Sequence, residues 1–324
     1  MLVTGANGFI GSHLVETLLD RGYAVRCMVR QTSDLTFIRD LAVEWAYVDV
    51  RDEDGLRQAC RGVDAVCHCA SLTRALDEET FMRVNAEGTQ ALAQICIDVC
   101  PELKRFVFVS SQAACGPSQG PADVVDEFCH ARPITWYGRS KLAAERALHD
   151  LGSCLPLTIV RPSGVFGPRD RDFFTYFELV NRGLTLHIGR DDRWLSLIYI
   201  HDLVNLILLA LERDVAVGET YVASNTAHTH RELAGAIAKA LEKQPRRITL
   251  PEAVLTPMAL WAKVQGWLTG NPPLLNDQRV LDMRERYWLC SSEKAKRDLG
   301  FAARHDLETA VQETADWYLE SEWL

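Results

Sequence analysis

The sequence predicts an α/β protein in which a doubly wound parallel sheet carries a smaller, interleaved and mostly helical lobe. Short apolar runs alternate with amphipathic helical segments through the first half of the chain, as in parallel sheets that are covered by helices. A glycine-punctuated turn joins the first strand to the first helix. The 324 residues, 48% of them hydrophobic, can bury the core of one large domain or of two closely joined ones.

The chain opens with a strand, a tight turn and a helix. Leu2–Thr4 is a short apolar strand, and the apolar residues after the turn recur at helical spacing until Gly22. The turn has the pattern GxxGxxG, whose glycines allow a sharp bend, close approach of the backbone to a pyrophosphate, and close helix packing. The predicted cofactor-binding residues of this turn are Gly5, Asn7, Gly8, Phe9, Ile10 and Gly11.

Strands and helices continue to alternate after this unit. Further strands are predicted at residues 23–30, 43–48, 64–70, 105–110 and 157–161, and long helices at 78–100 and 136–151. The fourth strand contains Cys67-His68-Cys69, but no second CxxC or HxxxH in the sequence completes a zinc ligand set. We therefore expect small buried residues there and no metal site.

The character of the sequence changes near residue 164, where Gly-Pro punctuation and an aromatic run at 173–177 precede a mostly helical pattern. We expect residues 1–163 to form the dinucleotide-binding domain. Residues 195–225 are predicted to return to it through a strand at 195–200 and a helix at 201–213. Residues 164–194 and 226–324 are predicted to form the substrate-binding lobe, in which Thr229-His230-Arg231-Glu232 is a capping box.

Charge and hydropathy exclude several classes of partner. Lys and Arg total 35 against 44 Asp and Glu, and the net charge of −9 argues against a nucleic-acid partner. The longest apolar run, near residues 203–211, is too short to cross a bilayer, and no charged leader with an apolar stretch precedes the first strand. We expect a cytoplasmic protein with a small-molecule substrate and no integral membrane segment.

Tyr137 and Lys141 are the strongest indication in the sequence of a catalytic function. Positions i and i+4 share one face of a helix, so the phenol and the ammonium can enter one pocket. A phenol has a pKa of about 10, and a neighbouring cation favours the phenolate. The pair is therefore a candidate device for proton transfer.

Several motifs in the expected order resemble those of the extended short-chain dehydrogenases/reductases, within the epimerase/dehydratase/3-beta-hydroxysteroid dehydrogenase superfamily. The resemblance covers nearly the whole chain and implies a Rossmann domain that binds NAD(P), followed by a substrate-binding lobe. The matching residues are Gly5, Gly8, Gly11, Asp49, Val50, His68, Cys69, Ala70, Asn85, Ser110, Ser111, Tyr137, Lys141, Arg161 and Pro162.

The resemblance implies roles for these residues. Tyr137 would exchange a proton with the substrate oxygen, and Lys141 would bind the nicotinamide ribose and lower the pKa of the phenol. Ser111, five residues before Gly116, would hydrogen-bond the same oxygen. Asn85 completes the predicted catalytic set. The remaining predicted cofactor-binding residues are Asp49 and Val50 near adenine, Cys69, Ala70 and Ser71 at the end of the fourth strand, Pro162 near nicotinamide, and Val165. Asp49 as a simple turn residue remains the alternative.

The choice of cofactor depends on the end of the second strand. An acidic residue there would bind the ribose hydroxyls, whereas an arginine accommodates a 2′-phosphate. The chain has Arg30 at this place. The sequence therefore predicts a preference for NADP(H), with NAD(H) as the alternative.

Departures from the nucleotide-sugar members bear on the substrate. Gly164 stands where those members often carry an asparagine, and Gln112-Ala113 replaces the acidic pair of the dehydratases. The favoured activity is reversible hydride transfer between nicotinamide and a ketone or secondary alcohol. A nucleotide-sugar epimerase with the same Ser, Tyr and Lys, and a non-catalytic NAD(P)-binding sensor, remain alternatives.

Two predictions concern apolar side chains outside the dinucleotide site. The first is an apolar pocket, with plain core as the favoured interpretation for most of its residues, which are Phe173, Phe174, Phe177, Trp194, Pro257, Trp261 and Trp267. Segment 251–270 is interpreted as a lid or core in preference to a membrane-surface helix. The resemblance also implies a homodimer held by a four-helix bundle, to which Ala91, Leu92, Ile95, Ala143, Ala144 and Ala147 are suited, although they suit the sheet face equally.

Overall fold

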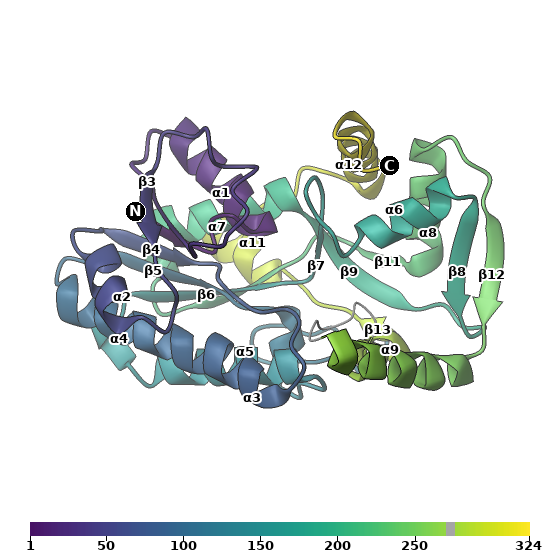
Figure 1. Ribbon diagram of the computed structural model, residues 1–324, viewed down its shortest axis with the longest axis horizontal. Coiled ribbons are helices and arrows are strands. Elements are labelled where there is room, and N and C mark those ends of the chain that lie inside the picture. Colours follow the sequence, from purple (N-terminus) through teal and green to yellow (C-terminus); the bar gives the residue numbers. More distant parts are fainter. Residues whose placement is uncertain (270–275) are drawn as a thin grey trace.

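The computed structural model describes residues 1–269 and 276–324 and shows a large sheet domain beside a smaller lobe (Figure 1). Within the described residues, seven parallel strands form the central sheet in the order β3-β2-β1-β4-β5-β6-β10. These strands are β1 (Leu2–Thr4), β2 (Arg26–Val29), β3 (Glu44–Tyr47), β4 (Ala65–His68), β5 (Arg105–Val109), β6 (Leu157–Pro162) and β10 (Thr220–Ala223). The strand order reverses between β1 and β4, which confirms the predicted doubly wound sheet.

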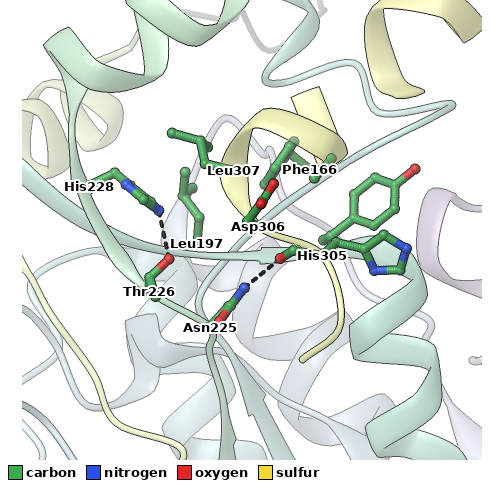
Figure 2. Close-up of a pocket in the computed structure, with 10 residues that line it drawn as sticks. Phe166, Leu197, Asn225, Thr226, His228, His305, Asp306 and Leu307 are labelled. Carbon is green, nitrogen blue, oxygen red and sulfur yellow. Dashed lines mark hydrogen bonds between the residues drawn. The ribbon is translucent and has the colours of Figure 1, made fainter. Parts of the chain in front are cut away.

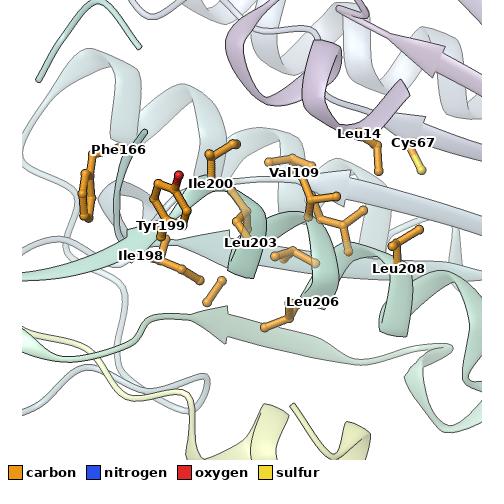
Figure 3. Packing of buried hydrophobic residues seen from close by; sticks show 14 of the residues in the cluster. Leu14, Cys67, Val109, Phe166, Ile198, Tyr199, Ile200, Leu203, Leu206 and Leu208 are labelled. Carbon is orange, nitrogen blue, oxygen red and sulfur yellow. The ribbon is translucent and has the colours of Figure 1, made fainter. Parts of the chain in front are cut away.

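Helices cover both faces of this sheet (Figure 1). One face is covered by α1 (Phe9–Asp20), α7 (Ile200–Glu212) and α11 (Glu293–Leu299), and the other by α2 (Glu53–Cys60), α4 (Gly88–Val99) and α5 (Trp136–His149). Figure 3 shows the first apolar layer, in which Leu203, Leu206 and Leu208 of α7 pack with Leu14 and Val109. The buried faces of both helical layers thus hold the strand ends in place.

The long helix predicted at residues 78–100 contains a wider, π-helical turn. It consists of α3 (Glu78–Phe81), a π-helical turn (Met82–Glu87) and α4. Such wide turns often occur at functional sites. Asn85, a predicted catalytic residue, lies in this turn.

The strand predicted to return to the central sheet at 195–200 does not do so, and that prediction is wrong. It forms β9 (Trp194–Tyr199), which pairs with β7 (Gly164–Phe166), β11 (Ala227–Thr229) and β13 (Tyr287–Trp288) in a smaller sheet. The strand that returns is β10, beside β6. An apolar run identifies a buried strand but not the sheet that buries it.

The smaller lobe also contains a parallel pair of strands, β8 (Leu184–Ile188) and β12 (Arg246–Leu250). Its helices are α6 (Phe174–Asn181), α8 (His230–Ala240), α9 (Leu255–Thr269), α10 (Asp277–Arg284) and α12 (Leu307–Glu320). The capping box at Thr229 and Glu232 is confirmed at the start of α8. No described helix is both long and apolar enough to span a membrane.

The aromatic residues of this lobe divide between core and surface. Phe177 is fully buried, as the core interpretation expects. Trp261 is 68% exposed, so the core interpretation is wrong for it. Phe173 and Phe174 are half-buried. The side chain of Trp267 lies outside the described part of the structure, as do residues 270–275.

Candidate functional site

The predicted site residues lie at the carboxyl ends of neighbouring strands. Asn7 and the three glycines follow β1, Arg30 follows β2, and Asp49 and Val50 follow β3. Cys69, Ala70 and Ser71 follow β4. Ser111 follows β5, and Pro162 ends β6. Val165 lies just beyond, in β7. The parallel strands thus bring residues that lie more than 150 positions apart in the sequence to one edge of the sheet, where ligands bind in such folds.

The glycine turn is packed too tightly for larger residues. Gly5 has a φ of +64°, and a Cβ atom built on it would lie 2.8 Å from the backbone of Ala70. A Cβ on Gly11 would lie 2.1 Å from the carbonyl oxygen of Gly5. These contacts press β1, α1 and the end of β4 together at the point where the strand order reverses, so both glycines are required by the geometry.

The N-terminus of α1 is suited to an anion. Gly8, its N-cap, supplies no side chain to the first-turn amides, and that turn contains no acidic residue. A Cβ on Gly8 would meet only the carbonyl oxygen of Gly5, at 3.2 Å. Free amides at a helix N-terminus, beside a backbone open to close approach, fit the pyrophosphate of a dinucleotide.

The adenosine end of the predicted site is basic. Arg30 is exposed after β2, and its amide donates to Ser33 Oγ at 3.1 Å. Asp49 accepts two hydrogen bonds from the Arg51 guanidinium, at 2.7 and 3.0 Å, and these lower the pKa of its carboxyl. Asp49 also accepts from the Arg51 amide, so its contacts are those of the turn residue considered as the alternative.

Tyr137 lies in the first turn of α5, whose N-cap Thr135 accepts a hydrogen bond from the Gly138 amide at 3.1 Å. Burial raises the pKa of the phenol to about 12, although hydrogen bonds with Ser111 and Ser71 lower it in part. The hydroxyls of Tyr137 and Ser111 therefore lie within hydrogen-bonding reach of each other, and with a pKa of about 12 the phenol is protonated at neutral pH. The lowering of the pKa that was expected from Lys141 is not seen: burial dominates, and the groups that oppose it are the hydroxyls of Ser111 and Ser71.

Lys141 is 2% exposed and lies one helical turn further along α5. Its ammonium donates to the Val109 carbonyl oxygen at 2.7 Å and lies 4.6 Å from the centre of the Phe108 ring. Burial lowers the pKa of this lysine to about 8. The side chain thus anchors α5 to the end of β5, two residues before Ser111.

The buried ammonium of Lys141 predicts a specific dependence of stability on pH. Between about pH 8 and 10.5, the folded protein has released this proton while the unfolded chain still binds it, so stability rises with pH. We expect Lys141→Met to remove about 2 kcal/mol of this rise between pH 7.5 and 10. Urea denaturation of the cofactor-free protein at pH 7.5 and 10, compared between wild type and variant, measures it. Parallel pH curves for the two proteins would contradict the prediction.

Asn85 is fully satisfied by the protein itself. Its side-chain oxygen accepts from the Leu72 amide at 2.8 Å, and its amide nitrogen donates to the Leu72 carbonyl at 2.9 Å and to Ser140 Oγ at 3.0 Å. These bonds tie the loop that carries Ser71 to the helix that carries Tyr137. The contacts are those of a positioning residue, and a direct catalytic role stays a prediction.

His68 and Cys67 also have structural contacts. The ring nitrogens of His68 lie 2.6 Å from Thr4 Oγ1 and 2.8 Å from Thr89 Oγ1, and burial lowers its pKa to about 3. Cys67 is fully buried between neighbouring strands, as expected. The neutral imidazole therefore joins β1, β4 and α4.

Sequence reasoning missed several charged groups near Tyr137. Asp172 and Asp282 each raise the pKa of the Tyr137 phenol through their charge. Asp172 is paired with Arg74, whereas Oδ1 of Asp282 is buried without a hydrogen-bond partner in the described structure. Burial raises the pKa of Asp282 to about 6. No short motif marks these residues, because they come from separate segments that only the fold brings together.

Two hollows lie outside the predicted reaction centre. The residues in Figure 2, which include Asn225, His228 and His305, line a space of about 10 Å³ between the smaller sheet and α12, which is roughly the size of one water molecule. A second hollow of about 250 Å³ lies between α2 and α4 and is lined in part by Val50 and Arg51. The second hollow therefore borders residues predicted to lie near adenine.

Comparison with known proteins places this geometry in a family. The chain matches the model of the NAD dependent epimerase/dehydratase family over residues 1–224. It is 30% identical to ceramide reductase of Caulobacter vibrioides over 99% of this chain and 95% of the relative. It is 32% identical to sterol demethylase protein B of Methylococcus capsulatus over 98% of both chains.

Solved structures share the fold. A UDP-glucose 4-epimerase of Thermus thermophilus, in complex with NAD, superposes with a TM-score of 0.80 at 24% identity, covering 98% of both chains. The chain therefore belongs to the NAD dependent epimerase/dehydratase family, within the extended short-chain dehydrogenases/reductases, and is an enzyme of that group.

Proposed function

We propose that the protein transfers hydride reversibly between NADP(H) and the carbonyl or alcohol carbon of a lipophilic substrate. The observation that carries this proposal is the protonated Tyr137 phenol, held against the hydroxyls of Ser111 and Ser71 at the carboxyl edge of the sheet. A neutral phenol can donate a proton to a substrate oxygen, as the reduction of a ketone requires. When bound, a nicotinamide dinucleotide supplies or accepts the hydride.

The protein's own groups divide the remaining work. Ser111 would donate a hydrogen bond to the substrate oxygen and fix it beside the Tyr137 hydroxyl, which would release its proton as the oxygen becomes an alkoxide. The buried ammonium of Lys141 would stabilise the resulting phenolate. In this proposal Asn85 holds the Ser71 loop and α5 in register, so that Tyr137 and Ser111 meet.

Gly164 favours a reductase over a nucleotide-sugar epimerase. A Cβ atom on Gly164 would lie 3.0 Å from Leu197 Cδ2 and 3.2 Å from Phe173 Cζ. The asparagine found here in nucleotide-sugar members would need these apolar side chains to move, so this position is built for packing against apolar groups. Two of the similar proteins are named for ceramide and sterol substrates, which fits a lipophilic alcohol or ketone.

A cofactor-linked assay tests the proposal. Reduced-nicotinamide absorbance would be followed with long-chain 3-keto lipids and 3-keto sterols, and separately with UDP-glucose, whose epimerisation is read by chromatography. We expect oxidation of NADPH with a lipid ketone and no change in UDP-glucose. Conversion of UDP-glucose without net cofactor change would favour the epimerase. Cofactor binding with no turnover of any substrate would favour the sensor.

The exposed Arg30 supports the preference for NADP(H), because its guanidinium can pair with a 2′-phosphate. We expect Arg30→Ala to weaken NADPH binding about 10- to 100-fold, since a charge-assisted hydrogen bond is lost, and to change NADH binding less than about twofold. Fluorescence titration measures both affinities. Arg39→Ala, at another exposed arginine, is the matched control. Equal losses for the two cofactors would contradict the assignment.

Two broader features belong to the same proposal. We place the enzyme in the cytoplasm, where its ten free cysteines would stay reduced.

We also propose a homodimer through α4 and α5. Leu92, Ile95 and Ala144 are buried against the sheet and Ala143 packs partly against the same core, whereas Ala91 is exposed and Ala147 is half-buried. Ala91 and Ala147 are therefore available to pack against a partner's helices.

A further inference from the structure

Helix α9 has an exposed apolar face, which consists of Met258, Leu260, Trp261, Val264 and Leu268. Leu260 is 64%, Trp261 68% and Leu268 71% exposed, although all five are large apolar residues. The opposite side of the helix is buried, where Leu255 and Ala259 pack on Val280 of α10. Figure 1 shows α9 at the outer edge of the smaller lobe. Exposed large apolar side chains thus follow one helix for more than two turns, whereas scattered single ones are normal.

Helix α10, which packs beside this face, carries both signs of charge: Asp277 and Asp282 as well as Arg279 and Arg284. Helix α9 contains no acidic residue and one lysine. Arg279 and Arg284 are exposed on the neighbouring α10 and form no ion pair within the described residues. The charge of Arg279 acts on Asp282, whose charge in turn acts on Tyr137, so only Arg284 is assigned to the α9 face. Arg284 donates to Thr256 Oγ1 of α9 at 2.6 Å, which fixes its guanidinium beside the first turn of that helix. An apolar face with Arg284 beside it and no acidic residue on its own helix is complementary to an anionic lipid surface.

The face adjoins the predicted reaction centre through α10. The Trp136 amide, one residue before Tyr137, donates to the side-chain oxygen of Gln278 at 2.9 Å. Asp282 of the same α10 acts on the Tyr137 phenol through its charge. The exposed face of α9 and the hydroxyl of Tyr137 therefore lie on either side of one short helix that packs against both of their helices.

We propose that the apolar face of α9 docks on the surface of an anionic lipid bilayer, without spanning it, and that the enzyme takes its substrate from that bilayer. The second half of this statement rests on the proposed lipophilic substrate. A second copy of the chain is the competing occupant. The five side chains expose on the order of 500 Å², below the roughly 800 Å² per partner that a stable dimer buries. Trp, Leu and Met beside arginine are the side chains that interfacial helices use.

Vesicle flotation tests the docking. The full chain would be mixed with vesicles of phosphatidylglycerol and phosphatidylcholine, or of phosphatidylcholine alone. We expect flotation with the anionic vesicles, and a loss of at least about tenfold in the Trp261→Glu/Leu268→Glu double variant. Arg284→Gln, which removes the arginine bonded to α9, should bind more weakly and lose part of its salt dependence. Phe128→Glu/Leu319→Glu, which adds the same charge at exposed apolar sites elsewhere, should float like wild type.

The outcomes separate docking from catalysis. Failure of wild type to float, or equal flotation of the α9 and control variants, would overturn the proposal. So would a change from dimer to monomer in the α9 variant by analytical ultracentrifugation, because the face would then bind a second copy. The α9 variant should keep NADPH affinity and turnover of a short, water-soluble ketone, and lose rate only with vesicle-borne substrate. If no ketone is turned over while flotation still depends on α9, the proposed function fails and the docking stands.

Discussion

Tyr137→Phe should lower kcat for ketone reduction by about 10³-fold or more, while the affinity for NADPH changes less than about twofold. The variant keeps the ring and loses the proton that the hydroxyl donates to the substrate oxygen, and general acid catalysis of this kind contributes about 10²- to 10⁴-fold. The phenol is protonated at neutral pH, since burial raises its pKa to about 12, so the loss should be seen across pH 6 to 9. Steady-state rates and a fluorescence titration of NADPH give the two numbers.

Tyr221→Phe is the matched control, because its hydroxyl lies far along the sheet and makes one long hydrogen bond, 3.5 Å, to the Val215 carbonyl. It should retain full activity. Ser111→Ala should give a smaller loss than Tyr137→Phe, since it removes a hydrogen bond but not the proton donor. Residual activity of Tyr137→Phe near the wild-type value would mean that another group donates the proton.

Glu145→Ala should destabilise the fold by about 3 to 5 kcal/mol, because it leaves a buried guanidinium without its counter-ion. Arg161 Nη2 lies 2.6 Å and its Nε 3.0 Å from the carboxylate oxygens of Glu145, and the two side chains are 10% and 2% exposed. The same carboxylate accepts a hydrogen bond from Ser110, next to Ser111. Urea denaturation at pH 7 measures the loss.

Glu308→Ala gives the comparison for this ion pair. Glu308 pairs with Lys239 at 2.6 Å, but both side chains are about 70% exposed, so the change in stability should stay below about 1 kcal/mol. Equal effects of the two substitutions would show that the Arg161 guanidinium finds water or another acceptor. Glu145→Gln should lie between them, since it keeps the shape and the hydrogen bonds but not the charge.

The sequence predicted the parts of this molecule that local patterns determine. The alternation of strands and helices predicted the parallel sheet, and the position of Ser111 after one strand and Tyr137 in the next long helix brought both to the same edge. Carboxyl ends of parallel strands meet by topology alone, so no long-range detail was needed. The capping box at Thr229 is equally local.

The rest depends on contacts between distant segments. The direction of the Tyr137 pKa shift follows from burial and from Asp172 and Asp282, which no spacing relates to the YxxxK pattern. Whether β9 joins the central or the smaller sheet depends on the strands with which it pairs. The apolar residues of β9 suit either sheet equally. The exposure of Trp261 has the same origin, because apolar residues at helical spacing do not reveal which face finds a partner.

The π-helical turn at Met82–Glu87 gives one continuous helix two orientations. A wide turn adds about one residue to the helical repeat, and each residue of an α-helix advances about 100° around the axis. The side chains before and after it are therefore offset in phase. Phe81 points its ring toward Tyr137, with the ring centres 6.3 Å apart, while Leu92 is buried against the sheet. An unbroken α-helix would have to give up one of these partners. The wide turn therefore lets one continuous helix contact Tyr137 through Phe81 and the sheet through Leu92.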